Sequence, residues 1–251
     1  MRRRLSVAAG LAALIVTAPA SGQQEVAADG YAFDKPRLLT QQLTWGLAHG
    51  VELLATACRE AEGTGREVAD AYAAWRSRYR ERIDRAGREL SQHYFAIDGA
   101  SPERLDAALH LKPQLDQRPD EIAAACASFA HAMATPRYDL DMFYELRRDA
   151  ARVERAEAVR QRVADCARKL AGDAAAVLET RFAAWTQANE LIENVARSRL
   201  LSLKGDRAED RQWRRDAGAG AVPPATACDQ LADRLVEPGY ALRDVFGDGD
   251  R

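Results

Sequence analysis

Histidine and cysteine are the residue types in this chain best suited to acid–base, nucleophilic or metal chemistry, and there are four of each. The histidines are His49, His93, His110 and His131, all in the N-terminal part of the chain. No two of them are spaced to hold one metal ion on a helix face, and no HExxH motif occurs. P-loop, GxGxxG, GxSxG and CxxCH signatures are also lacking. We therefore expect no cofactor and no metal site, and we assign no catalytic residue.

The four cysteines are better explained by disulfide bonds than by metal binding, because none has a second Cys or a His at zinc-ligand spacing. They are Cys58, Cys126, Cys166 and Cys228. In an exported protein an even number of cysteines favours disulfides. Of the three pairings, an internal repeat favours Cys58 with Cys126 and Cys166 with Cys228. Crossed pairing and free buried thiols are the alternatives.

The repeat consists of two stretches with the same spacing of Cys, Phe or Leu, Ala, Met or Leu, Pro, Tyr and Leu. The first copy is Cys126, Phe129, Ala130, Met133, Pro136, Tyr138 and Leu140, and the second is Cys228, Leu231, Ala232, Leu235, Pro238, Tyr240 and Leu242. Offsets of three, four and seven describe one face of a helix, and a proline after them ends it. Each copy is thus predicted to be a short Cys-bearing helix followed by a turn and a Tyr anchor.

Two tryptophans extend the repeat towards the N-terminus of each copy. Tyr72-Ala73-Ala74-Trp75 corresponds to Phe182-Ala183-Ala184-Trp185. The two tryptophans could be taken for a ligand-stacking pair, but each lies on an apolar helical stripe beside two alanines, which favours a core position. We expect Trp75, Trp185, Tyr138 and Tyr240 to be structural core residues.

The pattern around these residues is helical throughout, and no window alternates with the period of a convincing strand. We predict an all-α, duplicated helical bundle with pseudo-twofold symmetry. Each copy should contain two long helices and a shorter Cys-bearing helix. The predicted repeats are residues 37–140 and 141–246, with a tail at 247–251. The first copy alone should carry a helix at Ser101–Leu111, and residues 204–221 should form a loop or frayed helix in the second.

The N-terminus has the layout of a secretory signal peptide over residues 1–22. Arg2, Arg3 and Arg4 precede an apolar run from Leu5 to Val16, and Ala18-Pro19-Ala20 gives a cleavage site. The run is shorter than the roughly 20 residues that span a bilayer, so a retained anchor is the weaker interpretation. Residues 23–36 lack periodicity and are expected to form a mobile lead-in. The protein should therefore be exported to the periplasm or beyond, with no stable membrane anchor after cleavage.

Charge makes nucleic acid an unexpected partner. The formal net charge is −2, and it becomes −5 when the three leader arginines are removed. Arginines alternate with acidic residues along the helices, as on a solvated helix face. The sequence has no run of basic residues that could bind along a phosphate backbone. The same interleaving gives no sign of a catalytic carboxylate pair.

The aromatic junction between the copies is the expected binding seam, with Tyr138, Phe143 and Tyr144 as its candidate residues. Pockets favour such interfaces, although these rings would equally serve to seal the copies together. The function we expect is a non-enzymatic binding or inhibitory protein of the bacterial periplasm. Its partner would be a protein or a small amphipathic ligand. An enzyme with a site confined to the first copy and a structural envelope component are the alternatives.

Overall fold

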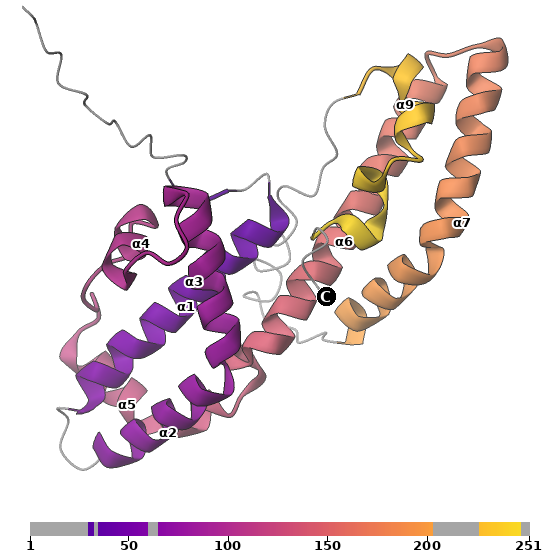
Figure 1. Ribbon diagram of the computed structural model, residues 1–251. Coiled ribbons are helices and arrows are strands. Elements are labelled where there is room, and N and C mark those ends of the chain that lie inside the picture. The colour runs from indigo at the N-terminus through magenta and orange to yellow at the C-terminus, as the bar shows by residue number, and fades with distance from the viewer. Residues whose placement is uncertain (1–29, 33–34, 60–64, 203–225, 247–251) are drawn as a thin grey trace, which may run out of the picture.

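The computed structural model describes residues 30–32, 35–59, 65–202 and 226–246, and every regular element in these ranges is helical. The expected all-α class is confirmed for this part of the chain. The helices form two units joined by the long helix α6 (Leu140–Ala167), which leaves the first unit and runs through the second (Figure 1). No helix in the described ranges has an apolar stretch long enough to cross a lipid bilayer.

The first unit is built around α1 (Pro36–Arg59). This helix packs against three others: α2 (Gly65–Arg78), α3 (Arg80–Phe95) and α5 (Pro119–Met133). Helical spacing predicts one buried stripe along α2, α3 and their junction, and all of its residues except the half-buried Tyr72 are buried, namely Val68, Trp75, Tyr79, Ile83, Ala86, Leu90 and Tyr94. Val68, Trp75, Tyr79 and Ile83 pack in one cluster with Val51 and Cys58 of α1 and Phe129 of α5. Leu90 and Tyr94 belong to the smaller cluster described below.

The rod formed by α2 and α3 bends at Tyr79, whereas the spacing predicts one uninterrupted helix there. Tyr79 has φ −102° and ψ 14°. Its amide still bonds to the carbonyl of Trp75 at 3.1 Å, and its own carbonyl accepts from Ile83 at 3.0 Å. The bend therefore keeps these backbone hydrogen bonds while both halves follow α1, as helices that wrap around a core do.

A small helix, α4 (Pro102–Ala108), closes the end of the first unit near α3. Its Leu105, together with Leu109, Leu90 and Tyr94, forms a separate buried cluster. Ser101 precedes α4 with extended backbone and Pro102 is its first residue, as expected for a proline at a helix start. This helix has no counterpart among the described residues of the second unit.

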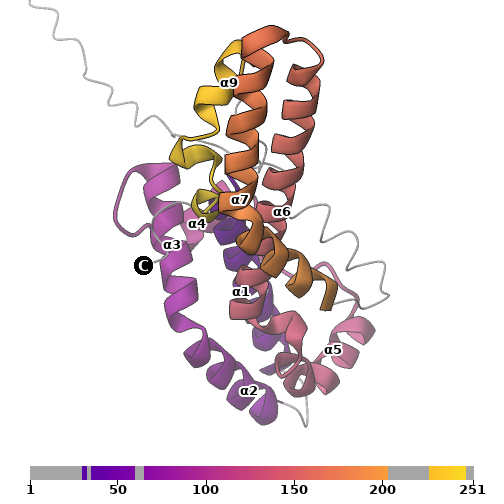
Figure 2. The ribbon, with the colours of Figure 1, turned by 90° about the vertical axis from the view of Figure 1, so that its right-hand side faces the viewer.

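The second unit is an antiparallel pair of long helices, α6 and α7 (Gly172–Ser202), with α9 (Cys228–Arg234) packed beside them (Figure 2). Two short 3-10 turns, η2 (Pro238–Tyr240) and η3 (Leu242–Asp244), complete its core. The buried residues include Trp185, Leu231, Tyr240 and Leu242. In the first unit a similar turn, η1 (Pro136–Tyr138), follows α5.

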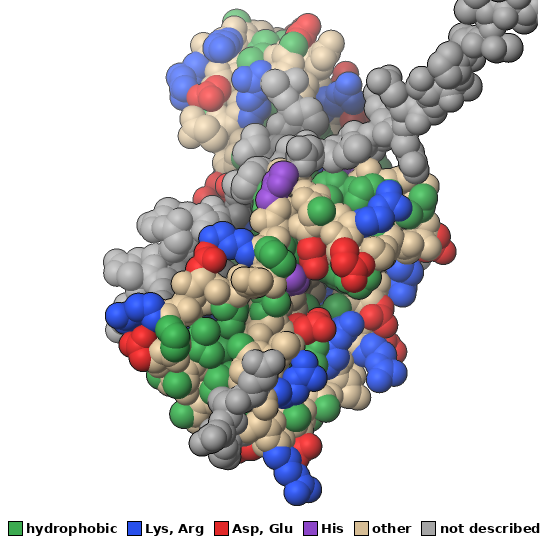
Figure 3. Space-filling model, turned by 90° about the vertical axis from the view of Figure 1, so that its left-hand side faces the viewer, with side chains coloured by type: hydrophobic (Ala, Val, Ile, Leu, Met, Phe, Trp, Pro, Cys, Tyr) green, Lys and Arg blue, Asp and Glu red, His purple; other side chains and the backbone are tan. Residues whose placement is uncertain are grey.

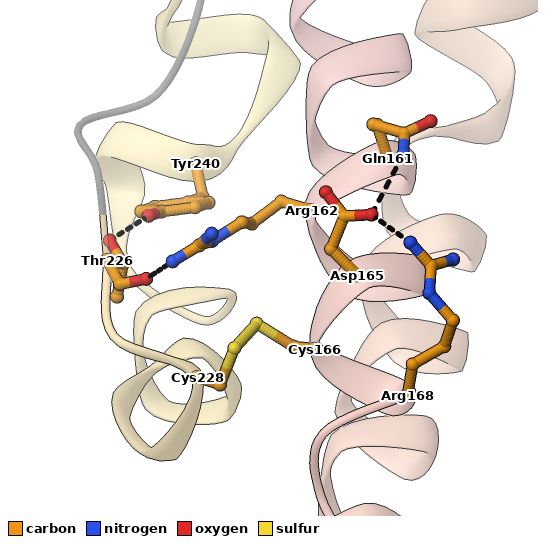
Figure 4. The surroundings of a disulfide bond; sticks show 8 residues. All are labelled: Gln161, Arg162, Asp165, Cys166, Arg168, Thr226, Cys228 and Tyr240. Atoms are coloured by element: carbon orange, nitrogen blue, oxygen red, sulfur yellow. Dashed lines mark hydrogen bonds and ion pairs between the residues drawn. A yellow bond between two sulfur atoms is a disulfide. The ribbon is translucent and has the colours of Figure 1, made fainter.

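The sequence predicts that Pro223 and Pro224 open the last Cys-bearing helix, but both prolines lie outside the described residues, among which α9 begins at Cys228. Ala227 is extended, with φ −62° and ψ 148°. Thr226 is fixed beside it, since its carbonyl accepts from Arg162 and its hydroxyl bonds to that of Tyr240 at 2.7 Å (Figure 4). These contacts hold Thr226 and Ala227 outside the helix, directly before Cys228.

Each unit has one disulfide, and the pairs are those expected from the repeat. Cys58 joins Cys126 across 68 residues, and Cys166 joins Cys228 across 62. All the cysteines are thereby paired. Figure 4 shows the second bond linking α6 to the start of α9. In the chain-entropy account, a loop of this length stabilises the fold by about 4 kcal/mol.

The two units meet where α6 passes α1. Tyr144 of α6 is buried there, with its ring 5.4 Å from that of Phe246 in an edge-on arrangement. The guanidinium of Arg82 lies 4.2 Å from the centre of the Tyr144 ring and pairs with Asp141 at 2.8 Å. Arg37 donates to the carbonyl of Phe246 at 3.3 Å. Helix α6 starts at Leu140, so Phe143 and Tyr144 lie in its first turns and not in a linker.

Residues 1–29, 203–225 and 247–251 lie outside the described ranges. The signal peptide, most of the lead-in, the loop at 204–221 and the tail at 247–251 therefore remain predictions.

Candidate functional site

An open cavity of about 490 Å³ lies where the start of α6 meets the end of α7. Its lining is Met142, Glu145, Leu146, Arg199 and Ser202. Met142 and Leu146 are one helical turn apart and give it an apolar wall. Asp139 fixes the start of α6, because its carboxylate accepts from the amides of Asp141 and Met142 at 3.0 Å.

A charged rim faces this apolar wall. Arg199 lies 3.6 Å from Glu145 and 3.3 Å from Asp149. The Asp149 side chain is only 1% exposed and is also paired with Arg152 at 3.3 Å. Arg199 is half-exposed, so it can reorient towards a ligand while Asp149 keeps its second partner. The cavity thus offers apolar surface beside one accessible cation and one accessible anion.

The candidate seam residues are not part of the lining of this cavity. Tyr144 is buried between the units, and Phe143 is half-buried in the same turn of α6. Tyr138 is half-buried in η1, and its carbonyl accepts a hydrogen bond from the indole of Trp75 at 2.8 Å. The cavity residues were missed at the sequence level because Leu146 reads as one more member of the buried stripe of α6.

The histidines do not converge. His49 meets a carboxylate, with Nδ1 3.1 Å from Asp106, and its Nε2 lies 2.8 Å from the carbonyl of Lys112. Trp45 also donates to Asp106, at 2.8 Å. Both ring nitrogens of His49 are therefore engaged in tying α1 to α4 and the segment after it. His93 contacts the Tyr94 ring instead.

Within the described ranges, no three His, Cys, Asp or Glu side chains lie close enough to hold a metal ion. Acidic and basic side chains are interspersed over the face in Figure 3, without a large patch of one sign. This distribution matches the alternating charges of the sequence.

Two carboxyl groups, one on α6 and one on α7, have pKa values displaced in opposite directions. Burial raises the pKa of Glu154 to about 7, and the charge of Glu157 adds to the effect. Burial also acts to raise the pKa of Glu193, but hydrogen bonds from Arg160 and Arg197 outweigh it and hold the pKa below its ordinary value. Both groups lie on the α6–α7 pair, away from the cavity lining. Neither faces a nucleophile or a histidine among the contacts described.

The two tryptophans occupy matching environments. Each is 4% exposed, and each donates its indole N–H to the backbone carbonyl of a tyrosine, Trp75 to Tyr138 and Trp185 to Tyr240. The two distances are 2.8 and 2.9 Å. With both indole nitrogens engaged inside the protein, neither ring is available as a ligand-stacking surface.

Comparison with protein-family models, with curated proteins and with solved structures returns no match to this chain.

Proposed function

We propose that this chain is an exported, non-enzymatic helical protein, built from a duplicated unit, that binds an amphipathic ligand at the α6–α7 cavity. The ligand would be a small molecule or a segment of a partner protein with an apolar body and a charged group. The bacterial periplasm is the proposed compartment.

Duplication is supported by three features that recur in the same order. Each unit has a long helix that carries the first cysteine, then the tryptophan on the α2–α3 rod or on α7, and then a third helix with the second cysteine. A 3-10 turn that begins at proline and ends at tyrosine follows in both units. The Trp-to-Tyr carbonyl hydrogen bond then closes each unit.

Export is supported by the two disulfides, because such bonds persist mainly in oxidising compartments. The signal-like N-terminus agrees with this proposal, although it lies outside the described residues. Protein recovered from the periplasm of an expressing bacterium should begin after Ala20 or Gly22. An intact Met1 terminus on that protein would count against cleavage.

The observation that carries the binding proposal is the pairing of an apolar wall, Met142 and Leu146, with the half-exposed Arg199. Apolar surface supplies affinity, and one charged group fixes orientation. Catalysis would need a nucleophile or a base with a partner that orients it. The cavity lining contains Ser202 and Glu145, and Glu145 is already paired with arginines.

Binding can be measured with 8-anilinonaphthalene-1-sulfonate, a probe with apolar rings and an anionic group. The oxidised mature protein should bind it saturably. Leu146→Glu should weaken binding at least about 10-fold, because it places a charge on the apolar wall. Arg199→Ala should weaken binding by a smaller factor if the sulfonate pairs with the guanidinium.

Two control variants place an equal charge elsewhere. Val236→Glu and Leu191→Glu change exposed apolar residues of the second unit outside the cavity, and they should bind the probe as the wild type does. Equal binding by wild type and Leu146→Glu would exclude the cavity as the binding site. If Leu191→Glu were the only variant to lose probe binding, the binding site would lie on the outer face of α7.

A further inference from the structure

One edge of the Arg199 guanidinium group is uncommitted at the rim of the α6–α7 cavity. The contacts of Arg199 with Glu145 and Asp149, at 3.6 and 3.3 Å, are both made through Nη1. Among the described residues, no acceptor bonds to its Nε or Nη2. The side chain is 52% exposed. The Nε–Nη2 edge can therefore donate two parallel hydrogen bonds to the oxygens of one anion while Nη1 keeps its partners.

Arg37 shows this binding geometry elsewhere in the same protein. Its Nε donates to Oε2 of Glu89 at 3.0 Å, and its Nη2 donates to Oε1 at 2.6 Å. Its Nη1 meanwhile donates to a different acceptor, the carbonyl of Phe246, at 3.3 Å. Arg199 has the Nη1 contact of this arrangement but lacks the carboxylate on the other edge.

The charges around Arg199 favour an anion over a cation. Glu145 is already paired with Arg148, and Asp149 is already paired with Arg152 at 3.3 Å. Arg199 brings a third guanidinium group to these two carboxylates, an excess of one positive charge. A cationic ligand would have to compete with two arginines for Glu145, whereas a singly charged anion would balance the group.

The neighbouring acidic residues do not cancel this excess, because each has an arginine of its own. Asp141, one helical turn before Glu145, pairs with Arg82 at 2.8 Å. Asp139 lies 3.5 Å from Arg78. These two pairs are neutral and leave the sign of the group unchanged.

Arg152 also indicates that positive charge is crowded here. It bonds to one carboxylate oxygen of Asp149 and Arg199 bonds to the other, so the two guanidinium groups are neighbours. Burial lowers the pKa of Arg152, and the charge of Arg148 lowers it further. Its buried Nε has no acceptor in the part of the chain that the structure describes. An anion at Arg199 would offset part of this repulsion.

The rest of the cavity lining is suited to an apolar chain. Met142 and Leu146 form the wall, and the methionine side chain can adapt to the shape of a ligand. The Ser202 hydroxyl already donates to the carbonyl of Arg199 at 2.8 Å. Arg199 is therefore the side chain in the lining that has donors to offer to a ligand.

We infer, on the basis of the binding function proposed above, that the ligand is a singly charged anion on an apolar chain, held by the Nε–Nη2 edge of Arg199. The apolar chain lies against Met142 and Leu146. Carboxylate, sulfate ester and phosphodiester groups all present two oxygens to such an edge. A free fatty acid and an anionic phospholipid are two sources of this chemistry.

Displacement of N-phenyl-1-naphthylamine, an uncharged fluorescent probe, from the oxidised mature protein tests the sign of the ligand. Decanoate and decyltrimethylammonium have closely matched chains and opposite charges. Decanoate should displace the probe from the wild type at a concentration at least about 5-fold lower than decyltrimethylammonium does. Arg199→Gln should remove this preference by weakening decanoate alone. Arg199→Lys should be intermediate, because an ammonium group keeps the charge but lacks the two parallel donors.

The matched control is Arg181→Gln, which removes an exposed arginine from the same helix outside the cavity lining and should keep the preference of the wild type. Circular dichroism and thermal unfolding confirm that each variant is folded. Equal displacement by decanoate and decyltrimethylammonium would overturn the inference and leave the binding function intact. A loss of preference in Arg181→Gln as large as that in Arg199→Gln would also overturn it, because the effect would then come from overall charge.

Probe binding itself reports on the binding function. Leu146→Glu should abolish it, because the probe has no charge and needs the apolar wall. A wild type that does not bind the probe saturably, or whose probe binding survives Leu146→Glu, would contradict the binding function and the inference with it.

Vesicles separate the two sources of the anion. Co-sedimentation of the wild type, but not of Arg199→Gln, with phosphatidylglycerol vesicles would assign the anion to a lipid head group. Phosphatidylcholine vesicles, which carry no net charge, are the control. Displacement of the probe by decanoate without co-sedimentation would assign it to a free fatty acid. Either result supports the inference, and the absence of both would overturn it.

Discussion

The indole nitrogen of Trp75 donates a hydrogen bond of 2.8 Å to the backbone carbonyl of Tyr138, 63 residues away in the chain. The bond joins the middle of the α2–α3 rod to the turn after α5. Trp185 makes the same bond to Tyr240, 2.9 Å long, across 55 residues. The hydrogen bond is buried in the second unit and partly buried in the first, and in both the tryptophan fixes where the proline-led turn docks.

Trp75→Phe and Trp185→Phe should each lower the free energy of unfolding by about 2 kcal/mol. The reason is that phenylalanine keeps most of the apolar ring but leaves the tyrosine carbonyl without its donor. Trp→Ala at either position should cost about 3–5 kcal/mol, because the emptied site also loses its packing. Urea unfolding of the oxidised protein measures both effects. A Trp→Phe variant as stable as the wild type would show that the hydrogen bond contributes nothing.

Removal of the first disulfide, by Cys58→Ala with Cys126→Ala, should destabilise the protein by up to about 4 kcal/mol through the entropy of the 68-residue loop. The equivalent Cys166→Ala and Cys228→Ala variant should lose a similar amount, since its loop is 62 residues long. Denaturant unfolding compares the variants. Peptide mapping without reductant should recover Cys58 with Cys126, and recovery of Cys126 with Cys166 would contradict the pairing.

Much of the fold could be predicted from spacing, because helical periodicity and cysteine positions are local properties of the sequence. The stripe from Val68 to Tyr94 and the disulfide partners follow from counting residues. The docking of α4 could not be predicted in this way. It depends on a long-range contact in which Trp45 of α1 bonds to Asp106, 61 residues away.

Gly87 is an example of a residue whose role only the structure shows. Glycine is unfavourable inside a helix such as α3. A Cβ atom at position 87 would lie 2.9 Å from the ring of Trp45, so the glycine makes room for that ring. The sequence pattern alone marks Gly87 as a weakness in the helix, because it contains no information on which side chain approaches from α1.

The candidate cavity was still harder to predict, because no pattern in the sequence distinguishes its residues from ordinary helix faces. Leu146 has the spacing of the buried stripe of α6, and Arg199 resembles the other arginines of solvated faces. Their meeting depends on how the end of α7 returns to the start of α6. That relationship is tertiary, so it is absent from helical periodicity.

Glu193 should stabilise the protein in a pH-dependent way. Its side chain is 7% exposed and is paired with Arg160 and with Arg197, the latter at 2.8 Å. Because these bonds hold its pKa below the ordinary value of 4.5, their contribution is present above pH 4.5 and is lost as the pH falls through the lowered pKa. Glu193→Gln should therefore cost about 1–3 kcal/mol at pH 7 and less in acid.

Thermal or urea unfolding at several pH values checks this dependence. Glu190→Gln, on the exposed side of the same helix, is the matched control and should change stability little at any pH. A Glu193→Gln variant whose deficit is the same at pH 7 and at pH 3 would contradict the role of the ion pairs.

Glu154 should behave in the opposite sense. Its Oε2 is buried and has no hydrogen-bond partner among the described residues. Burial and the nearby Glu157 raise its pKa from 4.5 to about 7, so the folded protein favours the neutral carboxyl group. The associated stability is present below pH 4.5 and is lost as the pH rises through 7, where the folded state must accept a buried charge.

Glu154→Gln removes that charge while keeping the shape of the side chain, so it should stabilise the protein at pH 8 and change little at pH 4. The full pKa displacement corresponds to roughly 3 kcal/mol, but partial exposure of the group reduces the expected gain to about 1 kcal/mol. Unfolding free energies of the variant and the wild type across this pH range provide the measurement. Glu190→Gln serves again as the exposed control. If Glu154→Gln were no more stable than the wild type at pH 8, the carboxylate would have to be solvated in the folded state.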